Sequence, residues 1–372
     1  MCMVTFDWSE NDAKEKFKNF DRRKRLSWVV LEVTDYCNFR CKWCFANSWI
    51  NKNPTHMSIE NVKKLIEFLS DSGVRQITFS GGEPTLYPYL RDAIKFASDY
   101  GLVVHMNTNG YLFTEKLARE LYSLGLTQVQ TDIDSLNPKK HDDIRGMKGS
   151  WIRAIKALKN AKNVGMTGAC QTVLTRENEN EILNIFRFAR SLGIQRCRVW
   201  DMTPSEGCSI KNAELMPSDY ISTLKRLCRY AEMTGAKSVE SGDPLFNAHI
   251  KTNLNVSGGY CVASAGLYTT ISCNGDAYFC ATIRKPMYNI FDIISSDIDF
   301  NLLHRSKLVE YTKKFKIPDG CMKCPFVYKC NGGCYTRREF MEDGVDYWCK
   351  VMQLPYREPH HYKTYKTEPS VI

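Results

Sequence analysis

Short apolar and β-branched runs alternate with longer segments of helical periodicity from residue 28 to about residue 201. Such alternation is typical of repeated strand–helix units around a parallel sheet. The segments between the runs carry apolar stripes at the 3.6-residue spacing of a helix face, which we interpret as packing surfaces without a functional role. Two such stripes are Val62, Leu65, Ile66 and Leu69, and Ile182, Ile185, Phe186 and Ala189. The pattern predicts six strands, at 28–33, 76–80, 103–107, 128–133, 169–174 and 196–200.

The pattern changes after residue 201, where a helix is predicted at 217–233 and is followed by a region rich in Gly, Asn and Cys. Cysteines become dense from residue 261, and this part is too irregular to be stable by burial of a core alone. Bound metal can supply the missing folding free energy. The predicted organisation is an N-terminal extension (1–27), an α/β domain (28–235), a bridging region (236–260), a cysteine-rich domain (261–354) and a tail (355–372).

The N-terminal sequence indicates a reducing compartment. The N-terminal segment lacks the apolar stretch and the small-residue cleavage site of a secretory signal, so a cytoplasmic location is expected. The 16 cysteines are then better explained as metal ligands or redox centres than as disulfides. The chain has no run of about 18 uncharged apolar residues and no RNA-binding or zinc-finger signature, so neither a membrane nor a nucleic acid is expected as a partner. The formal net charge of +10 could attract an anionic substrate or an acidic peptide.

The strongest chemical signal is the motif Cys37-x3-Cys41-x2-Cys44, which directly follows the first predicted strand. On a straight helix these positions would spread over roughly 10 Å, so a loop is better suited to surround one cluster. Thiolates are the usual ligands of iron–sulfur clusters, and three cysteines leave one iron of a four-iron cluster without a protein ligand. A structural zinc site normally has four protein ligands, which makes zinc the less favoured alternative.

The cysteine triad, the strand before it and the βα repeats resemble the radical S-adenosylmethionine (SAM) superfamily over nearly all of residues 28–201. The resemblance implies a partial (βα)6 barrel and a [4Fe–4S] cluster whose open iron chelates the amino and carboxylate groups of SAM. An electron from that cluster breaks a carbon–sulfur bond and yields methionine and a 5′-deoxyadenosyl radical. The resemblance also implies that Trp43, at the aromatic position before the third cysteine, contacts the adenine. Packing in the core is the alternative for Trp43.

The second predicted strand ends in Gly81-Gly82-Glu83-Pro84, which matches a Gly-Gly-Glu-Pro segment of that family. Two glycines let the backbone approach a ligand closely, and Glu83 can accept hydrogen bonds from the ammonium group of SAM. A plain turn is the alternative.

Weaker matches follow the third and fourth strands, at 107–110, 132–135 and 141–146. These segments resemble family segments that line the ribose and the carboxylate of SAM. The resemblance therefore implies cosubstrate contacts by Asn109, Asp134 and Arg145. A turn or a salt bridge is the alternative for each of them.

Seven further cysteines form a second constellation, with Cys321-x2-Cys324-x5-Cys330-x3-Cys334 at its centre. The arrangement resembles the SPASM domain of many radical SAM enzymes, which carries two auxiliary [4Fe–4S] clusters. The resemblance implies one cluster on Cys321, Cys324, Cys330 and Cys349, and another on Cys261, Cys280 and Cys334.

The second of these sets has three ligands. Either one iron is open to a substrate, or another group such as Cys273 completes the site. In sulfatase-maturing members an Asp general base follows the cysteine that matches Cys280, whereas this chain has Ala281. Formylglycine formation by that route is therefore not expected.

The leading functional hypothesis is hydrogen abstraction from a peptide or protein, with the auxiliary clusters transferring an electron or coordinating the substrate. Only 36 residues precede Cys37, so a separate recognition protein or direct docking is expected for a peptide. An electron donor such as ferredoxin or flavodoxin is a further expected partner.

Tetrapyrrole side-chain modification in haem-type biosynthesis and small-molecule dehydrogenation are the enzymatic alternatives. An iron–sulfur electron carrier or a zinc-binding protein would be a different class, and Gly81-Gly82-Glu83 argues against it because a carrier needs no cosubstrate pocket.

Overall fold

The computed structural model describes most of the chain between residues 26 and 349. All structural statements below refer to its described residues, which are 26–48, 53–194, 196–203, 220–234, 238–241, 243–245, 255–258, 261–296, 298–315, 317, 319–322, 324, 326–339, 341, 344–346 and 348–349.

One sheet organises these residues. Its strand order is β11-β10-β9-β1-β2-β3-β4-β5-β6-β7-β8. Every neighbouring pair from β9 through β1 to β8 is parallel, and β10 is antiparallel to both β9 and β11. The strands are β1 (Trp28–Thr34), β2 (Gln76–Gly81), β3 (Val103–Asn107), β4 (Leu126–Asp132), β5 (Thr167–Leu174), β6 (Arg196–Asp201), β7 (Ser238–Ser241), β8 (Asn255–Gly258), β9 (Tyr268–Ile271), β10 (Asp276–Cys280) and β11 (Ile283–Asn289).

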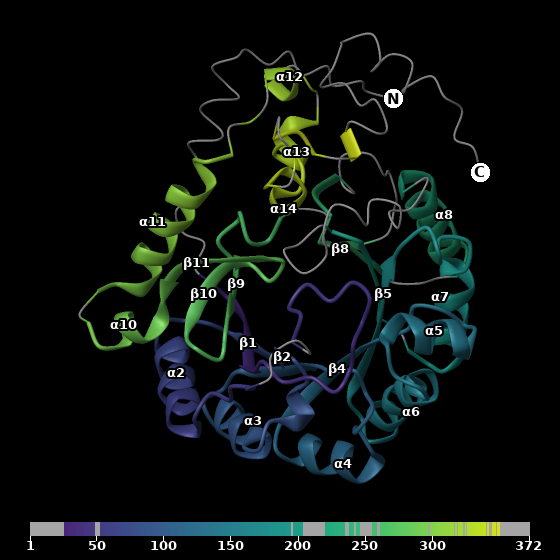
Figure 1. Ribbon diagram of the computed structural model, residues 1–372, viewed down its shortest axis with the longest axis horizontal. Coiled ribbons are helices and arrows are strands. Elements are labelled where there is room, and N and C mark those ends of the chain that lie inside the picture. Colours follow the sequence, from purple (N-terminus) through teal and green to yellow (C-terminus); the bar gives the residue numbers. More distant parts are fainter. Residues whose placement is uncertain are drawn as a thin grey trace.

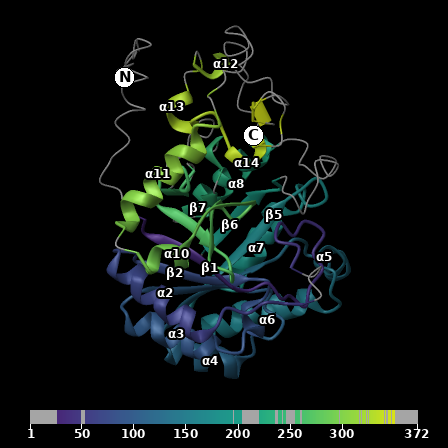
Figure 2. The same cartoon turned by 60° about the vertical axis from the view of Figure 1, so that its left-hand side comes forward.

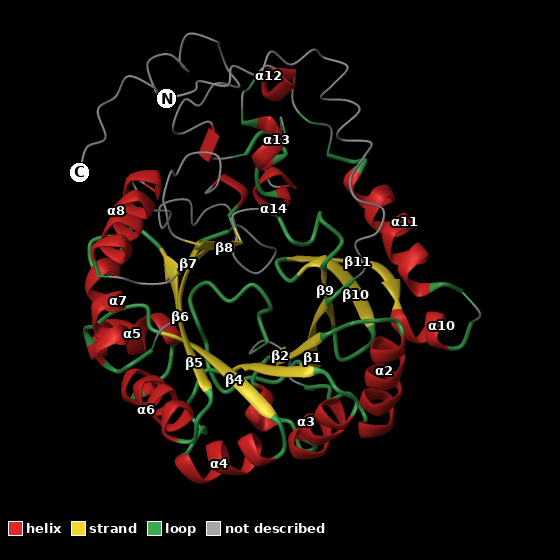
Figure 3. Ribbon diagram, turned by 180° about the vertical axis from the view of Figure 1, so that it is seen from behind, coloured by secondary structure: helices red, strands yellow, loops and turns green. Residues whose placement is uncertain are grey.

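The sheet is curved, and helices surround it on the outside (Figures 1 and 3). The loop that follows β1 lies inside the curve, whereas α12 and α13 lie at the opposite end of the molecule from α4 (Figure 2). The helices are α2 (Ile59–Asp71), α3 (Leu90–Asp99), α4 (Glu115–Ser123), α5 (Pro138–Arg145), α6 (Ser150–Asn163), α7 (Ile182–Ser191), α8 (Tyr220–Met233), α10 (Ile290–Ile294), α11 (Phe300–Thr312), α12 (Asp319–Met322), α13 (Val327–Cys330) and α14 (Tyr335–Glu339).

The six predicted strands are confirmed, with ends that differ by up to two residues from the predicted ones. The predicted helix 217–233 is present as Tyr220–Met233, and its first three residues lie outside the described part of the chain. Both predicted apolar stripes are buried, on α2 and on α7. Local signals fix the ends of α5, because the Asn137 side chain caps its first turn and Gly146 ends it in the left-handed conformation (φ 62°).

Five strands of the same sheet were not predicted. β7 and β8 lie in the predicted bridging region and continue the parallel sheet beyond β6. β9, β10 and β11 belong to the predicted cysteine-rich domain, yet β9 pairs with β1 at the other edge. The short strands Ser238–Ser241 and Asn255–Gly258 are mostly polar, so they carry no apolar period that would reveal them.

The two faces of the sheet differ in polarity. On the outer face, Val129 and Val199 join the apolar clusters formed with α6 and α7. On the inner face, the alternate positions of β4 are Gln128, Gln130 and Asp132. Strands of a parallel sheet that is packed on both faces are apolar throughout. The polar inner face therefore indicates that a functional site lies on this side of the sheet. None of the described helices is long and apolar enough to cross a membrane.

Candidate active site

The cysteine loop, defined here as residues 37–44, begins three residues after β1 and is held from two sides. On one side, the backbone N–H of Glu83 donates to the carbonyl of Tyr36 at 2.7 Å. On the other side, the N–H of Lys42 donates to the carbonyl of Ile144 at 2.9 Å, in the last turn of α5. The end of β2 and the end of α5 thus fix the path of the loop.

Gly81 and Gly82 permit the close approach of β2 to this loop. A Cβ atom on Gly82 would lie 2.1 Å from the carbonyl oxygen of Tyr36 and 2.9 Å from the nitrogen of Cys37. A Cβ atom on Gly81, whose φ is +127°, would lie 2.2 Å from the carbonyl oxygen of Thr34. We expected the two glycines to make room for a ligand. The structure adds a second reason for glycine at both positions, because the protein's own backbone occupies the space beside them.

Glu83 lies at the centre of a buried hydrogen-bond cluster and is 1% exposed. Its Oε1 accepts from the Thr85 N–H at 3.0 Å and from the Thr85 and Thr108 hydroxyls at 2.6 Å each. Its Oε2 accepts from the N–H of Asn109 at 2.7 Å. Burial raises the pKa of the Glu83 carboxyl, and these donors oppose the rise. Glu83 therefore joins the ends of β2 and β3 directly beside the cysteine loop.

Asn109 connects the end of β3 to the same loop. Its Nδ2 donates to Oδ1 of Asn38 at 2.8 Å, and its Oδ1 accepts from the N–H of Tyr111 at 2.9 Å. The side chain is buried, and both of its polar ends are engaged within the chain. Asn109 is therefore adjacent to the loop, and its amide positions Asn38.

Arg145 and Asp134 are turned toward one another. The Arg145 Nη1 group donates to Asp132 Oδ2 at 2.7 Å and lies 3.4 Å from Asp134 Oδ2. Asp134 is fully buried, and its other oxygen accepts from the N–H of Val173. Burial raises the pKa of Asp134 to about 7, and the Arg145 guanidinium opposes the rise. Asp134 and Arg145 thus make the ionic contacts that the salt-bridge alternative predicts.

Trp43 combines two properties. The side chain is buried in the cluster that contains Ile133 and Ile144, as the core alternative expected. Its indole Nε1 is also buried, and no hydrogen-bond partner for it is present among the described residues. A buried N–H without a partner is costly. An acceptor on a bound molecule would satisfy it.

The three thiols of the triad are within electrostatic reach of each other. Burial raises the pKa of Cys37 to about 11 and that of Cys41 to about 12, and the neighbouring Cys44 raises both further. Arg145 opposes both rises, so a positive charge lies beside the site where thiolates would be needed. This donor set fits an iron–sulfur cluster.

The thiols do not form a site for a single ion. Among the described residues, no three His, Cys, Asp or Glu side chains converge closely enough to hold one metal ion. A four-iron cluster needs a wider spacing, because each thiolate binds a different iron.

The cysteine-rich segment brings together the first predicted auxiliary set. Cys330 is influenced by the charges of Cys324 and Cys321, and Cys349 by those of Cys330 and Cys321. Burial raises the pKa of Cys321 to about 11 and that of Cys330 to about 12. The four cysteines that were assigned to one cluster therefore lie near one another.

A buried ion-pair network fixes this segment. The Arg337 guanidinium, 1% exposed, donates to Asp346 at 2.8 Å and to Asp243 at 3.0 Å. Asp346 also accepts from the backbone N–H groups of Cys334 and Trp348, at 2.6 and 3.0 Å. Asp346 thus links the positions of two cysteine-bearing turns.

The second auxiliary set is connected through two threonines. Cys261 and Cys280 are within electrostatic reach of each other. The Cys280 thiol contacts the Thr282 hydroxyl at 3.3 Å, and Thr282 bonds to Thr336, which follows Cys334 by two residues. Cys273, the alternative fourth ligand, lies instead in the electrostatic reach of Asp35, Glu32 and Arg284.

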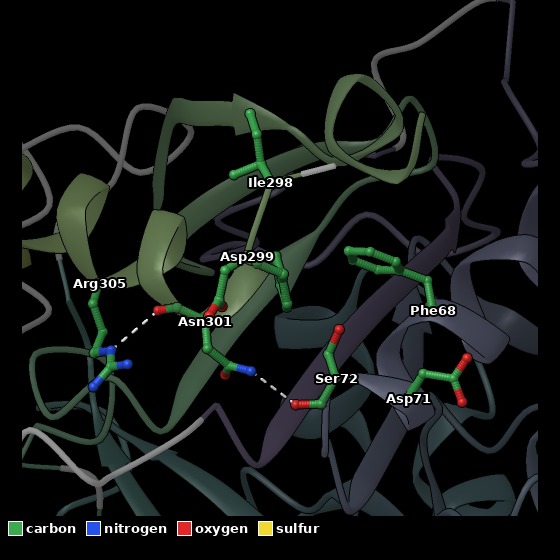
Figure 4. Close-up of a pocket in the computed structure, with 8 residues that line it drawn as sticks. Phe68, Asp71, Ser72, Ile298, Asp299, Asn301 and Arg305 are labelled. Atoms are coloured by element: carbon green, nitrogen blue, oxygen red, sulfur yellow. Dashed lines mark hydrogen bonds between the residues drawn. The ribbon is translucent and has the colours of Figure 1, made fainter. Parts of the chain in front are cut away.

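A pocket of about 400 Å³ lies elsewhere, between the end of α2 and the start of α11 (Figure 4). Asn301 closes one side by donating to the carbonyl of Ser72 at 2.9 Å. Phe68, Asp71 and Arg305 also line it. No residue that the sequence predicted for the site lines this pocket, so it adds nothing to the cysteine-loop site.

Three residues of the site were not predicted. Asn38, Thr108 and Asp132 make the contacts that hold the cysteine loop, Glu83 and Arg145. Thr108 and Asp132 lie in segments that were singled out, at the carboxyl ends of β3 and β4, so their place at strand ends was a usable signal. No sequence pattern distinguishes Asn38 from the other residues between the cysteines.

Comparison with known proteins identifies the family of the chain. Residues 31–189 match the Radical SAM superfamily. The chain is 32% identical over 345 residues to the Fe-coproporphyrin III synthase of Methanosarcina barkeri (strain Fusaro / DSM 804), with 85% of each chain covered. It is 27% identical over 330 residues to the mycofactocin maturase MftC of Mycolicibacterium smegmatis (strain ATCC 700084 / mc(2)155), covering 87% of this chain and 82% of the relative.

A solved structure shows the same fold. The crystal structure of Streptococcus suis SuiB bound to S-adenosylmethionine superposes with a TM-score of 0.69 at 18% identity, covering 92% of this chain and 81% of SuiB. Superfamily membership implies a [4Fe–4S] cluster and SAM. The chain therefore belongs to the radical SAM superfamily, and its relatives there include SPASM-type enzymes.

Proposed function

We propose that this protein cleaves SAM reductively and uses the resulting 5′-deoxyadenosyl radical to abstract a hydrogen atom from a peptide or protein. The convergence of the cysteine loop, Glu83 and Asn109 at the carboxyl ends of β1, β2 and β3 carries this proposal. A cluster bound to Cys37, Cys41 and Cys44 would supply the electron for SAM cleavage. Strands β1 to β6 with their helices would form the partial (βα)6 barrel that surrounds the reaction.

The residues around the loop have separate roles in this proposal. Glu83 Oε1 already accepts three hydrogen bonds, whereas Oε2 accepts one, so Oε2 has capacity for a donor such as the ammonium group of SAM. The Nε1 of Trp43, which has no hydrogen-bond partner in the described part of the chain, can donate to an acceptor on the adenosyl part. Gly81, Gly82 and Pro84 fix the backbone beside Glu83. The side chains of Asn109, Asp134 and Arg145 hold the cysteine loop in position.

The auxiliary sites are part of the proposal. Cys321, Cys324, Cys330 and Cys349 would hold one [4Fe–4S] cluster, and Cys261, Cys280 and Cys334 would hold another. Cys330 lies in the electrostatic reach of Cys321 and Cys324, Cys349 in that of Cys321 and Cys330, and Cys261 in that of Cys280, which supports this grouping. An electron donor such as ferredoxin or flavodoxin would reduce the enzyme.

The peptide substrate is supported by two relatives. MftC is named a maturase, and SuiB has been solved with its precursor peptide SuiA. A tetrapyrrole is the second candidate substrate. It is favoured by the 32% identity to a protein named Fe-coproporphyrin III synthase, which is higher than the identity to MftC.

Anaerobic reconstitution tests the proposal. Iron near twelve atoms per chain, with 5′-deoxyadenosine formed from SAM after reduction, is the expected result. Cys41→Ala should abolish deoxyadenosine formation, whereas Cys228→Ala, which changes a buried core thiol on α8, should retain it. Bound zinc, or no deoxyadenosine from the unaltered protein, would contradict the proposal.

Mass spectrometry after incubation with cell extract and SAM then identifies an altered peptide or an altered porphyrin.

A further inference from the structure

Two arginines on the inner face of the sheet share one carboxylate. Arg196 donates to Glu240 through Nε at 2.7 Å and through Nη2 at 3.2 Å. Arg198 donates to the same carboxylate through Nε. The Nη1 groups donate to the side-chain oxygens of Gln128 and Gln130 respectively. The adjacent strands β6 and β7, together with β4 on the far side of β5, thus contribute to one polar cluster.

The direction of the two side chains follows from the strand alternation. Cys197 and Val199 on β6 pack in the apolar cluster that includes Ile185 and Ala189 of α7. Arg196 and Arg198 alternate with them and therefore point to the other face, inside the curve of the sheet. Their side chains are 32% and 18% exposed, so both remain accessible from that side.

The cluster has an excess of positive charge. Two guanidinium groups face the single carboxylate of Glu240, and the remaining Nη2 of Arg198 makes no hydrogen bond to the described part of the chain. His105 is a further titratable group beside the two arginines. Burial and the two arginines lower its pKa to about 4, so at neutral pH it adds no charge. One positive charge is therefore not balanced within the cluster.

A hydrogen-bond chain connects this cluster to the cysteine loop. Gln130 donates to Gln171 at 3.0 Å, and Gln171 donates to Asp132 at 3.0 Å. Asp132 accepts from Arg145, whose guanidinium is near Cys41. Asp132 on β4 and Arg198 on β6 are two strand spacings apart, or about 10 Å. A molecule anchored at Arg198 can therefore extend along the inner face to the loop.

We propose that Arg196 and Arg198 form an anion subsite that binds a carboxylate group of the substrate. This inference rests on the proposed function and deepens it, because it states which chemical group orients the substrate. A peptide can supply the carboxylate from a Glu, an Asp or its C-terminus. A tetrapyrrole can supply it from a propionate. Paired arginines suit either source, because their planar forks bind carboxylates through parallel hydrogen bonds.

Equilibrium binding to the reconstituted protein at physiological ionic strength tests the subsite. The probes are coproporphyrin III with its tetramethyl ester, and a glutamate-rich synthetic peptide with its glutamine counterpart. For at least one of the two carboxylate probes, Arg198→Gln should weaken binding by about tenfold or more, because a charged hydrogen-bond pair is lost. The ester and the glutamine peptide should bind both proteins equally.

Glu240→Gln gives the opposite prediction. This nearly isosteric change removes the competing carboxylate, so the same probe should bind more tightly than to the unaltered protein. Arg119→Gln is the matched control, because it removes one exposed positive charge from the outer helix α4, and it should not change binding. If the two arginines had a purely structural role, Arg198→Gln and Glu240→Gln would both weaken binding or leave it unchanged.

Each outcome has a meaning for the proposal. The opposed effects on coproporphyrin III identify a tetrapyrrole carboxylate, and those on the peptide identify a peptide carboxylate. Equal binding of a carboxylate probe to all variants, or no saturable binding of either probe to the unaltered protein, overturns the subsite. Deoxyadenosine formation by the unaltered protein is measured separately. Its absence would contradict the proposed function and leave the binding result interpretable.

Discussion

The side-chain amide of Asn109 donates a hydrogen bond of 2.8 Å to the side-chain oxygen of Asn38 and thereby ties the segment after β3 to the start of the cysteine loop. Asn38 lies between the first two cysteines, so this bond acts on the segment that must hold its shape when iron binds. The backbone N–H of Asn109 also donates to Glu83. One residue therefore couples the loop to the buried carboxylate.

Replacing Asn38 with Ala should weaken this coupling. We expect a loss of about 1 kcal/mol in the free energy of unfolding, the net value of one such hydrogen bond. The loop should also release iron to a chelator faster than in the unaltered protein. Asn184→Ala, on the exposed side of α7, is the control and should change neither quantity. Equal rates of iron release would show that the bond does not support the loop.

Gly82→Ala should displace the cysteine loop. The added methyl group would meet the Tyr36 carbonyl at 2.1 Å, and backbone cannot move aside as a flexible side chain can. We expect a loss of about 3 kcal/mol in unfolding free energy, measured by denaturant titration, and failure to bind iron at the triad. Gly101→Ala is a stringent control, because its φ is also positive, at +75°, but apart from its chain neighbours no described residue lies within 4 Å of the added methyl group. That variant should lose about 1 kcal/mol from backbone strain and keep its iron. Similar iron content in both variants would contradict the importance of the close approach.

Asp346→Asn should release the auxiliary iron selectively. The substitution removes one acidic partner of the buried Arg337 and leaves its bonds to Asp243 in place, at an expected cost of about 3 kcal/mol. It also weakens the bonds to the N–H groups of Cys334 and Trp348. The iron content should fall from about twelve atoms per chain toward about four, which is the number expected for a cluster at the triad alone. Asp99→Asn removes an exposed ion pair with Lys95 and should leave the iron content unchanged. A uniform loss of iron from all sites would contradict a selective role.

The stability of the fold should decrease in mild acid, partly through His141. This residue is buried, its Nδ1 accepts from the N–H of Asp134, and burial lowers its pKa to about 3. Because the folded pKa is below the unfolded value of about 6.5, the stabilising contribution is complete above pH 6.5 and is lost as the pH falls toward 3. At pH 5 the expected loss from this residue is about 2 kcal/mol.

His141→Asn keeps an acceptor near the Asp134 N–H and removes the titrating group. The unfolding free energy of this variant should therefore depend less steeply on pH between 7 and 5. Parallel curves for the variant and the unaltered protein would show that His141 does not contribute to the acid sensitivity.

The sequence was informative wherever one short segment carried the signal. The alternation of apolar runs predicted β1 to β6, and burial of the stripes on α2 and α7 confirmed their packing role. The spacing of the cysteines placed Cys37, Cys41 and Cys44 in one loop. These features are local, so the order of residues encodes them directly.

Features that join distant segments were not predictable in the same way. Arg337 and Asp243 are separated by 94 residues, and nothing local to either one indicates a buried pair. For Asp134 and Arg145 the sequence left a contact with SAM and a salt bridge open, because a polar residue at a strand end can face either a ligand or a neighbouring charge. The pairing of Arg196 and Arg198 with Glu240 likewise depends on β7, a four-residue strand without an apolar pattern.

The pairing of β9 with β1 also has a consequence during synthesis. Ser27 donates a hydrogen bond to Leu267, which lies 240 residues later in the chain, and the two strands run side by side from there. While the ribosome is still translating the intervening segment, β1 has β2 on one side and an open edge on the other. Unpaired edges invite pairing with other chains, so the nascent protein is exposed to aggregation until Tyr268–Ile271 has emerged. Two conditions would therefore favour a high yield of native enzyme. One is contact with a chaperone during translation, and the other is rapid elongation up to residue 271, which shortens the time for which the edge of β1 is open.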